Sequence, residues 1–143
     1  MRKGVLFLLG WVSAGVAFGA EVIPVGEAVR IYRRDLPVKL EAFTKAEIAA
    51  CEKAGRLPDF KGELVGSAGW QKRRKGRRLN LDTIHFNREG KYLQACVWVA
   101  TLLGVDVTDL PYTPEFGDDF KRRAPLIRRC AMSACQEWKA SNP

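Results

Sequence analysis

The sequence DTIHFN at residues 82–87, followed by REGKYLQACVWVATLL at residues 88–103, decides much of the fold. Asn87 is a preferred N-cap residue because its side chain accepts a hydrogen bond from a free backbone N–H, and Gly104 suits the left-handed position that ends many helices. The segment between them is apolar on nearly every side, which is typical of a buried helix. We therefore expect residues 88–103 to form the central helix of the core.

Asp82 and His85 lie just ahead of this helix, in what we predict to be a loop, and His85 is the single histidine of the chain. A carboxylate that accepts a hydrogen bond from one imidazole nitrogen fixes the tautomer of the ring. The other nitrogen is then free to take a proton from a nucleophile. The positive end of the helix dipole would favour an ionised Asp82. Asp82 and His85 are therefore candidate catalytic residues.

The sequence LDTIHFNREGKYLQACVW at residues 81–98 resembles the C-terminal catalytic block of the SGNH (GDSL-like) hydrolases. Residues 21–28, EVIPVGEA, are similar to the late strand and turn that precede this block, and a looser resemblance extends to residue 139. Those enzymes are esterases, many of them acting on acetylated carbohydrates. The resemblance implies an α/β fold class, namely the C-terminal portion of a three-layer α/β/α fold, mostly helical with one or two short strands. It also implies that His85 is the general base and Asp82 its orienting partner in ester hydrolysis.

The nucleophile of that family has no counterpart here. The family serine belongs to a Gly-Asp-Ser-type motif and its oxyanion hole uses a Gly-x-Asn-Asp motif, and this sequence contains neither. We expect the serine to come from a preceding segment of the gene product or from a partner chain. Ser67, in GSAG at residues 66–69, is better explained by a glycine-rich turn than by a nucleophile elbow, which needs a strand before it and a helix after it.

The alternative hypothesis is a non-catalytic secreted module that retains the packing of that fold and binds an anionic ligand. Its candidate surface is a basic patch in a predicted loop. The patch consists of Lys72, Arg73, Arg74, Lys75, Arg77 and Arg78. The net charge of the chain is +8, but when residues 1–19 and the patch are left out, the other bases equal the acids in number. A solvated loop is the simpler interpretation, an anionic polysaccharide or membrane surface is the favoured partner, and nucleic acid is disfavoured because one tryptophan gives little stacking area.

The four cysteines, Cys51, Cys96, Cys130 and Cys135, form no C-x-x-C pair. With a single histidine beside them, they do not predict a metal site, and no organic cofactor is implied. Cys96 fits a small core residue. In an oxidising compartment a disulfide could join Cys51 to Cys130 or to Cys135.

Residues 1–19 have the pattern of a secretory signal peptide: a positive start, an apolar centre and a small-x-small cleavage site. The apolar run is shorter than the roughly 20 residues that span a bilayer. We therefore expect a secreted or periplasmic protein with one partial domain at residues 20–143. The alternative is a false start, in which residues 1–20 are an internal helix of a larger, cytoplasmic protein.

The remaining segments give simpler expectations. Residues 21–25 predict a short buried strand, and residues 27–34 a helix. Thr44 and Glu47 form a capping-box pattern that opens a helix to about residue 53. Residues 57–81, rich in glycine and bases, predict a loop or short hairpin. Residues 117–138 predict a long helix that Pro125 kinks or divides.

Overall fold

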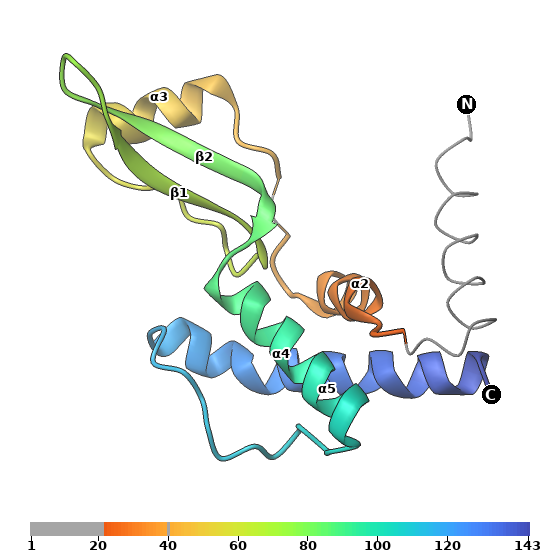
Figure 1. Ribbon diagram of the computed structural model, residues 1–143. Coiled ribbons are helices and arrows are strands. Elements are labelled where there is room, and N and C mark those ends of the chain that lie inside the picture. The colour runs from red at the N-terminus through yellow and green to blue at the C-terminus, as the bar shows by residue number, and fades with distance from the viewer. Residues whose placement is uncertain (1–21, 40) are drawn as a thin grey trace, which may run out of the picture.

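The computed structural model describes residues 22–39 and 41–143. In these residues the chain forms four helices and one two-stranded antiparallel sheet (Figure 1). In chain order the elements are α2 (Val25–Asp35), α3 (Lys45–Ala54), β1 (Val65–Lys72), β2 (Arg77–Phe86), α4 (Arg88–Leu103) and α5 (Asp118–Ser141). The fold is therefore mixed α and β and mostly helical, as the sequence predicts, although the two strands are longer than expected.

Helices α2, α4 and α5 pack against one another and form the body of the molecule (Figure 1). Their inward faces carry apolar side chains at helical spacing, so each helix buries one stripe. The body also buries Leu64 from the segment before β1 and Val107 from the segment after α4. The helix residues that are most fully buried are Ala28, Ile31, Tyr32, Leu93, Val97, Phe120, Ala124, Ile127, Cys130, Ala131 and Ala134.

The hairpin β1–β2 and helix α3 extend away from the body as an arm (Figure 1). In the antiparallel register, Ser67 lies opposite Asp82 and Lys72 lies opposite Arg77. The register shifts between Val65 and Ser67, where Gly66 of β1 alone faces three residues of β2, 83–85. Gly66 has a φ of 101°, a conformation that L side chains rarely adopt, which explains why a glycine occupies this position.

The arm joins the body through a few specific contacts. The Tyr32 hydroxyl of α2 donates to the Gly62 carbonyl at 2.8 Å. The Asn87 side-chain amide donates to the carbonyls of Glu63 at 2.6 Å and Gly66 at 3.2 Å, while the Asn87 backbone N–H donates to the Leu64 carbonyl at 3.0 Å. The end of the hairpin is therefore fixed where α4 begins.

Several expected helix ends are confirmed. Helix α3 begins with a complete capping box between Thr44 and Glu47. Helix α4 begins after Asn87, whose side chain accepts from the N–H groups of Glu89 and Gly90, and ends at Gly104 in the left-handed conformation. These ends are predictable because a cap depends on residues within one turn of the helix.

Helix α4 is not buried on every side, contrary to the expectation from its composition. One face packs in the body, but the side chains of Trp98, Leu102 and Leu103 are 47%, 52% and 70% exposed. Apolar composition alone does not tell how many sides of a helix are covered, because that depends on the neighbouring elements. In the part of the chain that the structure describes, α2 and α5 cover only one side of α4.

The predicted strand at residues 21–25 is wrong over the residues that the structure describes. Residues 22–24 have no regular structure, and Val25 is already the first residue of α2. Ala28, Val29, Ile31 and Tyr32 bury one face of this helix. Burial of that face outweighs the β-propensity of the preceding valine and isoleucine, which is a weak and context-dependent preference.

The division of the last helix at Pro125 is also wrong, because α5 is one continuous element from Asp118 to Ser141. Pro125 lies on the exposed side of this helix. Proline removes one N–H donor from a helix, and on a solvent-facing side water can satisfy the carbonyl that is left without a partner. The buried stripe of α5 is therefore uninterrupted.

The four cysteines are free and buried, so no disulfide joins Cys51 to Cys130 or Cys135. The predicted signal peptide at residues 1–19 lies outside the described residues. Among the helices at residues 22–39 and 41–143, none combines the length and the apolar character that crossing a membrane requires.

Candidate functional site

Asp82 and His85 form a hydrogen-bonded pair at the base of the arm. The His85 Nδ1 atom lies 2.8 Å from Asp82 Oδ2. Asp82 Oδ1 in turn accepts from the backbone N–H groups of Ile84 at 2.9 Å and His85 at 3.0 Å. The predicted contact between the two side chains is present, but both residues belong to strand β2 and not to a loop.

The local sequence explains this geometry. An aspartate side chain readily accepts hydrogen bonds from backbone N–H groups two and three residues further along the chain. With one oxygen held in this way, the other oxygen of Asp82 faces the His85 ring. The pair is therefore organised by hydrogen bonds within four consecutive residues.

The same hydrogen bonds keep Asp82 ionised. The backbone N–H of His85, then that of Ile84, then the His85 imidazole lower the pKa of Asp82 to about 2. Each of these donors favours the charged form of the carboxylate. The expectation of an ionised Asp82 agrees with this low pKa, whose largest causes are the hydrogen bonds from the backbone of residues 84 and 85.

The His85 side chain is 80% exposed, whereas that of Asp82 is 33% exposed. Because Nδ1 faces the carboxylate, Nε2 is the nitrogen that remains for a proton from a nucleophile or from water. Within the described ranges, Asp82 is the hydrogen-bond partner that the structure gives the His85 ring. Asp82 and His85 thus have the geometry of a carboxylate that orients a histidine, and in the described residues no serine or cysteine side chain is hydrogen-bonded to the His85 ring.

Ser67 lies in strand β1 and not in the glycine-rich turn that the sequence suggests. It is directly opposite Asp82, so the two side chains share one face of the hairpin. The sequence alone does not predict that Ser67 lies beside Asp82, because cross-strand register depends on residues far apart in the chain. Ser67 still lacks the strand-to-helix elbow that presents a nucleophilic serine.

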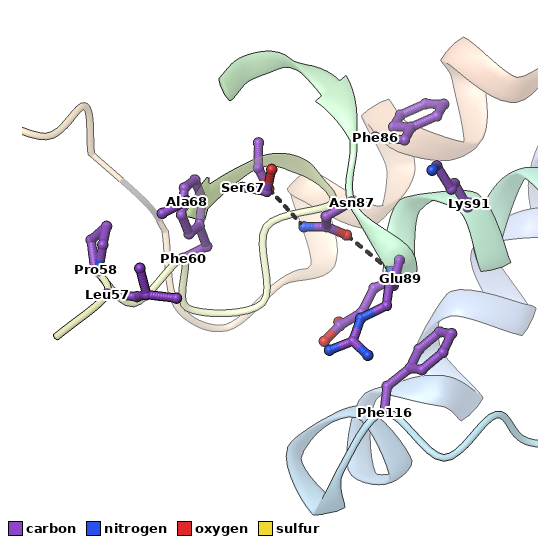
Figure 2. Close-up of a pocket in the computed structure, with 12 residues that line it drawn as sticks. Leu57, Pro58, Phe60, Ser67, Ala68, Phe86, Asn87, Glu89, Lys91 and Phe116 are labelled. Carbon is purple, nitrogen blue, oxygen red and sulfur yellow. Dashed lines mark hydrogen bonds between the residues drawn. The ribbon is translucent and has the colours of Figure 1, made fainter. Parts of the chain in front are cut away.

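A cavity of about 480 Å³ lies between the arm and the start of α4 (Figure 2). Its walls combine apolar rings with the polar side chains at the beginning of α4, and Asp82 and His85 are not among them. Asn87 lies in this wall, with its amide already bonded to the arm and its carbonyl oxygen bonded to α4. The residues around the cavity include Phe60, Ser67, Phe86, Asn87, Arg88 and Phe116.

The basic patch occupies the outer end of the hairpin, so of the two alternatives for residues 57–81, a loop or a short hairpin, the hairpin is correct for the patch. Lys72, Arg77 and Arg78 lie in the strands, and the other three bases lie in the turn between them. The backbone N–H of Arg73 donates to the Gly76 carbonyl at 3.0 Å and closes this turn. The guanidinium of Arg77 lies 4.3 Å from the centre of the Trp70 ring, a cation–π contact. The patch is therefore held in place by regular structure.

Residues 22–39 and 41–143 contain no group of three or more His, Cys, Asp or Glu side chains that could hold a metal ion. Comparison of the chain with protein-family models, with curated proteins and with solved structures gave no match.

Proposed function

We propose that Asp82 and His85 are the acid–base pair of an ester hydrolase of the SGNH (GDSL-like) type, and that the chain derives from the C-terminal part of that three-layer fold. The observation that carries the proposal is the distance of 2.8 Å between Asp82 Oδ2 and His85 Nδ1. The substrate class is an ester, such as the acetyl ester of a carbohydrate. The chemistry is acyl transfer to a serine and then to water.

In this reaction His85 Nε2 takes the proton of a serine hydroxyl while the serine oxygen attacks the ester carbonyl. The resulting imidazolium is stabilised by Asp82, which is ionised because its pKa is about 2. His85 then gives the proton to the leaving alcohol. Water hydrolyses the acyl-serine with His85 again as the base, which restores both residues.

The serine is proposed to come from a segment preceding the fold described above or from a partner chain. The exposed His85 ring supports this arrangement, because its free nitrogen is accessible to a group from outside. A histidine and carboxylate without the nucleophile give little rate enhancement, since triad members act as a unit. Activity therefore belongs to the protein together with its serine donor.

The test is hydrolysis of p-nitrophenyl acetate and labelling by a fluorophosphonate, with the protein isolated from its source cells. We expect His85→Ala to reduce kcat/KM by about 10³-fold or more, and Asp82→Asn by a comparable factor. Ile84→Ala is the matched control, because this exposed side chain lies between the two residues and its backbone N–H still donates to Asp82. It should leave the rate unchanged.

The labelled serine identifies the nucleophile. A label outside residues 22–143 or on a second polypeptide is expected, and Ser67→Ala should not remove it. Hydrolysis that persists in His85→Ala, or that is absent from the isolated protein, would overturn the proposal. The non-catalytic binding module would then be the better description.

A further inference from the structure

The hairpin has one face packed on helix α3 and one face open to solvent. Leu79 of β2 is buried, and its backbone N–H donates to the Glu52 side chain of α3 at 2.8 Å. Trp70 and Leu81 share this packed face, because cross-strand partners and alternate residues of a strand lie on the same side. Helix α3 therefore covers the apolar side of the hairpin.

The opposite face is lined by polar and small residues, and we call it the polar face. It is made by three cross-strand pairs: Ser67 with Asp82, Gly69 with Asn80, and Gln71 with Arg78. Asp82 is half-buried and the other five residues are exposed. The strip leads from the Asp82–His85 pair to the basic tip, over a length of about 14 Å for four residues of extended chain.

The tip has strong and uncompensated positive charge. The six bases of the patch lie within the seven consecutive positions 72–78, with one glycine among them, and all six are exposed. The ion pairs that the structure shows in residues 22–39 and 41–143 involve none of the six. Clustered charge of one sign attracts oppositely charged ligands over a range of about one Debye length, roughly 8–10 Å.

The chemistry of the polar face selects among polyanions. Base stacking on aromatic rings is the main contact of single-stranded nucleic acids with proteins, but Trp70 lies on the packed face and is occupied by Arg77. The polar face instead offers the hydroxyl of Ser67 and the side-chain amides of Gln71 and Asn80. These groups donate and accept hydrogen bonds, as sugar hydroxyls do.

We infer that the polar face and the basic tip form a binding site for an acidic polysaccharide, whose carboxylate or sulfate groups contact the tip while its sugars lie along the polar face. The binding itself is independent of catalysis. The further step, in which an ester on the same polymer meets His85, rests on the proposed function. The hairpin would then select the polymer at one end and present it to the acid–base pair at the other.

The test is the Kd of the whole protein for a fluorescent heparin oligosaccharide and for oligogalacturonate, with neutral dextran and a single-stranded DNA oligonucleotide as comparison probes. Two triple variants remove equal charge from different places. The tip variant carries Arg73→Gln, Arg74→Gln and Lys75→Gln. The matched control on α5 carries Lys121→Gln, Arg129→Gln and Lys139→Gln, at positions that are also exposed.

We expect the tip variant to weaken binding of both acidic oligosaccharides about tenfold, because each exposed charge contact contributes a few-fold. The α5 variant should change the Kd less than about twofold. The double variant Gln71→Ala and Asn80→Ala should weaken polysaccharide binding several-fold without a change in charge. Equal losses of affinity in the two triple variants would overturn the inference. So would DNA binding that is tighter than polysaccharide binding and has the same Kd in the double variant.

The His85→Ala protein separates this inference from the proposed function. Its Kd for the oligosaccharides should equal that of the unaltered protein, because His85 is not needed for binding. Binding that follows the pattern above in a protein without esterase activity would refute the hydrolase and leave the polysaccharide site. Esterase activity without such binding would refute the polysaccharide site alone.

Discussion

Replacement of Gly90 by alanine should destabilise the contact between the arm and the first turn of α4. Gly90 is buried in the first turn of α4, where a Cβ atom would overlap the Leu64 carbonyl oxygen and lie 2.8 Å from Cδ1 of Phe86. The Leu64 oxygen has no freedom to retreat, because it accepts the N–H of Asn87 at 3.0 Å. Either the helix or the arm must shift.

The magnitude follows from opposing effects. Overpacking of this kind costs about 1–3 kcal/mol, and loss of the Asn87 hydrogen bond about 1 kcal/mol more. Alanine recovers about 0.5–1 kcal/mol because it has less backbone freedom to lose than glycine. The net loss in the free energy of unfolding is therefore about 1–3.5 kcal/mol, which corresponds to a lowering of Tm by roughly 10 °C.

Urea denaturation followed by circular dichroism measures this loss, with Gly26→Ala as the matched control. Gly26 is also a helical glycine, in α2, but it is exposed and a Cβ atom there would meet nothing within 4 Å. This control should be as stable as the unaltered protein or gain up to about 0.5 kcal/mol. A Gly90→Ala protein within about 0.5 kcal/mol of the unaltered one would refute the contact between Leu64 and α4.

Three further results are expected. Glu89→Gln should lower the free energy of unfolding, measured in urea, by about 1–3 kcal/mol, because the Arg123 guanidinium loses its counter-charge. The two side chains are 2.6 Å apart, and neither is more than 25% exposed. Folding lowers the pKa of Asp82 to about 2, from about 3.9 in the unfolded chain. The unaltered protein should therefore exceed Asp82→Asn in stability by its full amount above about pH 3.9, and this difference should disappear as the pH falls through about 2. Urea titrations at successive pH values measure the difference. Burial raises the pKa of the Cys130 thiol to about 11, so Ellman's reagent should find almost no reactive thiol in the folded protein and all four after unfolding.

The first and last of these results have direct controls. Asp118→Asn breaks an exposed pair with Lys121 at 4.0 Å and should cost almost nothing, since exposed pairs contribute about 0–1 kcal/mol. A cost equal to that of Glu89→Gln would show that net charge, and not the pair, is responsible. Two thiols in the unfolded protein instead of four would indicate a disulfide. For Asp82, a difference in stability that vanishes near pH 4 would contradict the hydrogen bonds from residues 84 and 85.

The elements that sequence predicts well are those whose determinants are local. The capping box of Thr44 and Glu47, the Asn87 cap and the Gly104 end each depend on residues within one turn, and so does the hydrogen bond between Asp82 and His85. The family relationship and the catalytic roles that the sequence suggests remain predictions, which the hydrolysis assay tests.

The sequence leaves a loop and a short hairpin as alternatives for residues 57–81, and the choice of the hairpin needs information that is not local. The alternation of Leu79 and Leu81 with polar residues is a strand signal, but six bases and several glycines nearby favour a loop. The packed face becomes apparent only when α3 lies against it, through the Glu52 contact with Leu79. The position of Ser67 opposite Asp82 likewise follows from the register that continues from the turn through the pair Lys72–Arg77, and it is the last pair before that register shifts.

The side chain of Asn87 also requires the arm and the start of α4 to open together. Its oxygen accepts from the N–H groups of Glu89 and Gly90, and its amide donates to the carbonyls of Glu63 and Gly66, so one residue belongs to both the helix start and the arm. Local opening of the arm must therefore release the first turn of α4. Hydrogen exchange at the amides of Glu89 and Gly90 should report the same opening free energy as the amides of the arm, and exchange deeper in α4 a larger one.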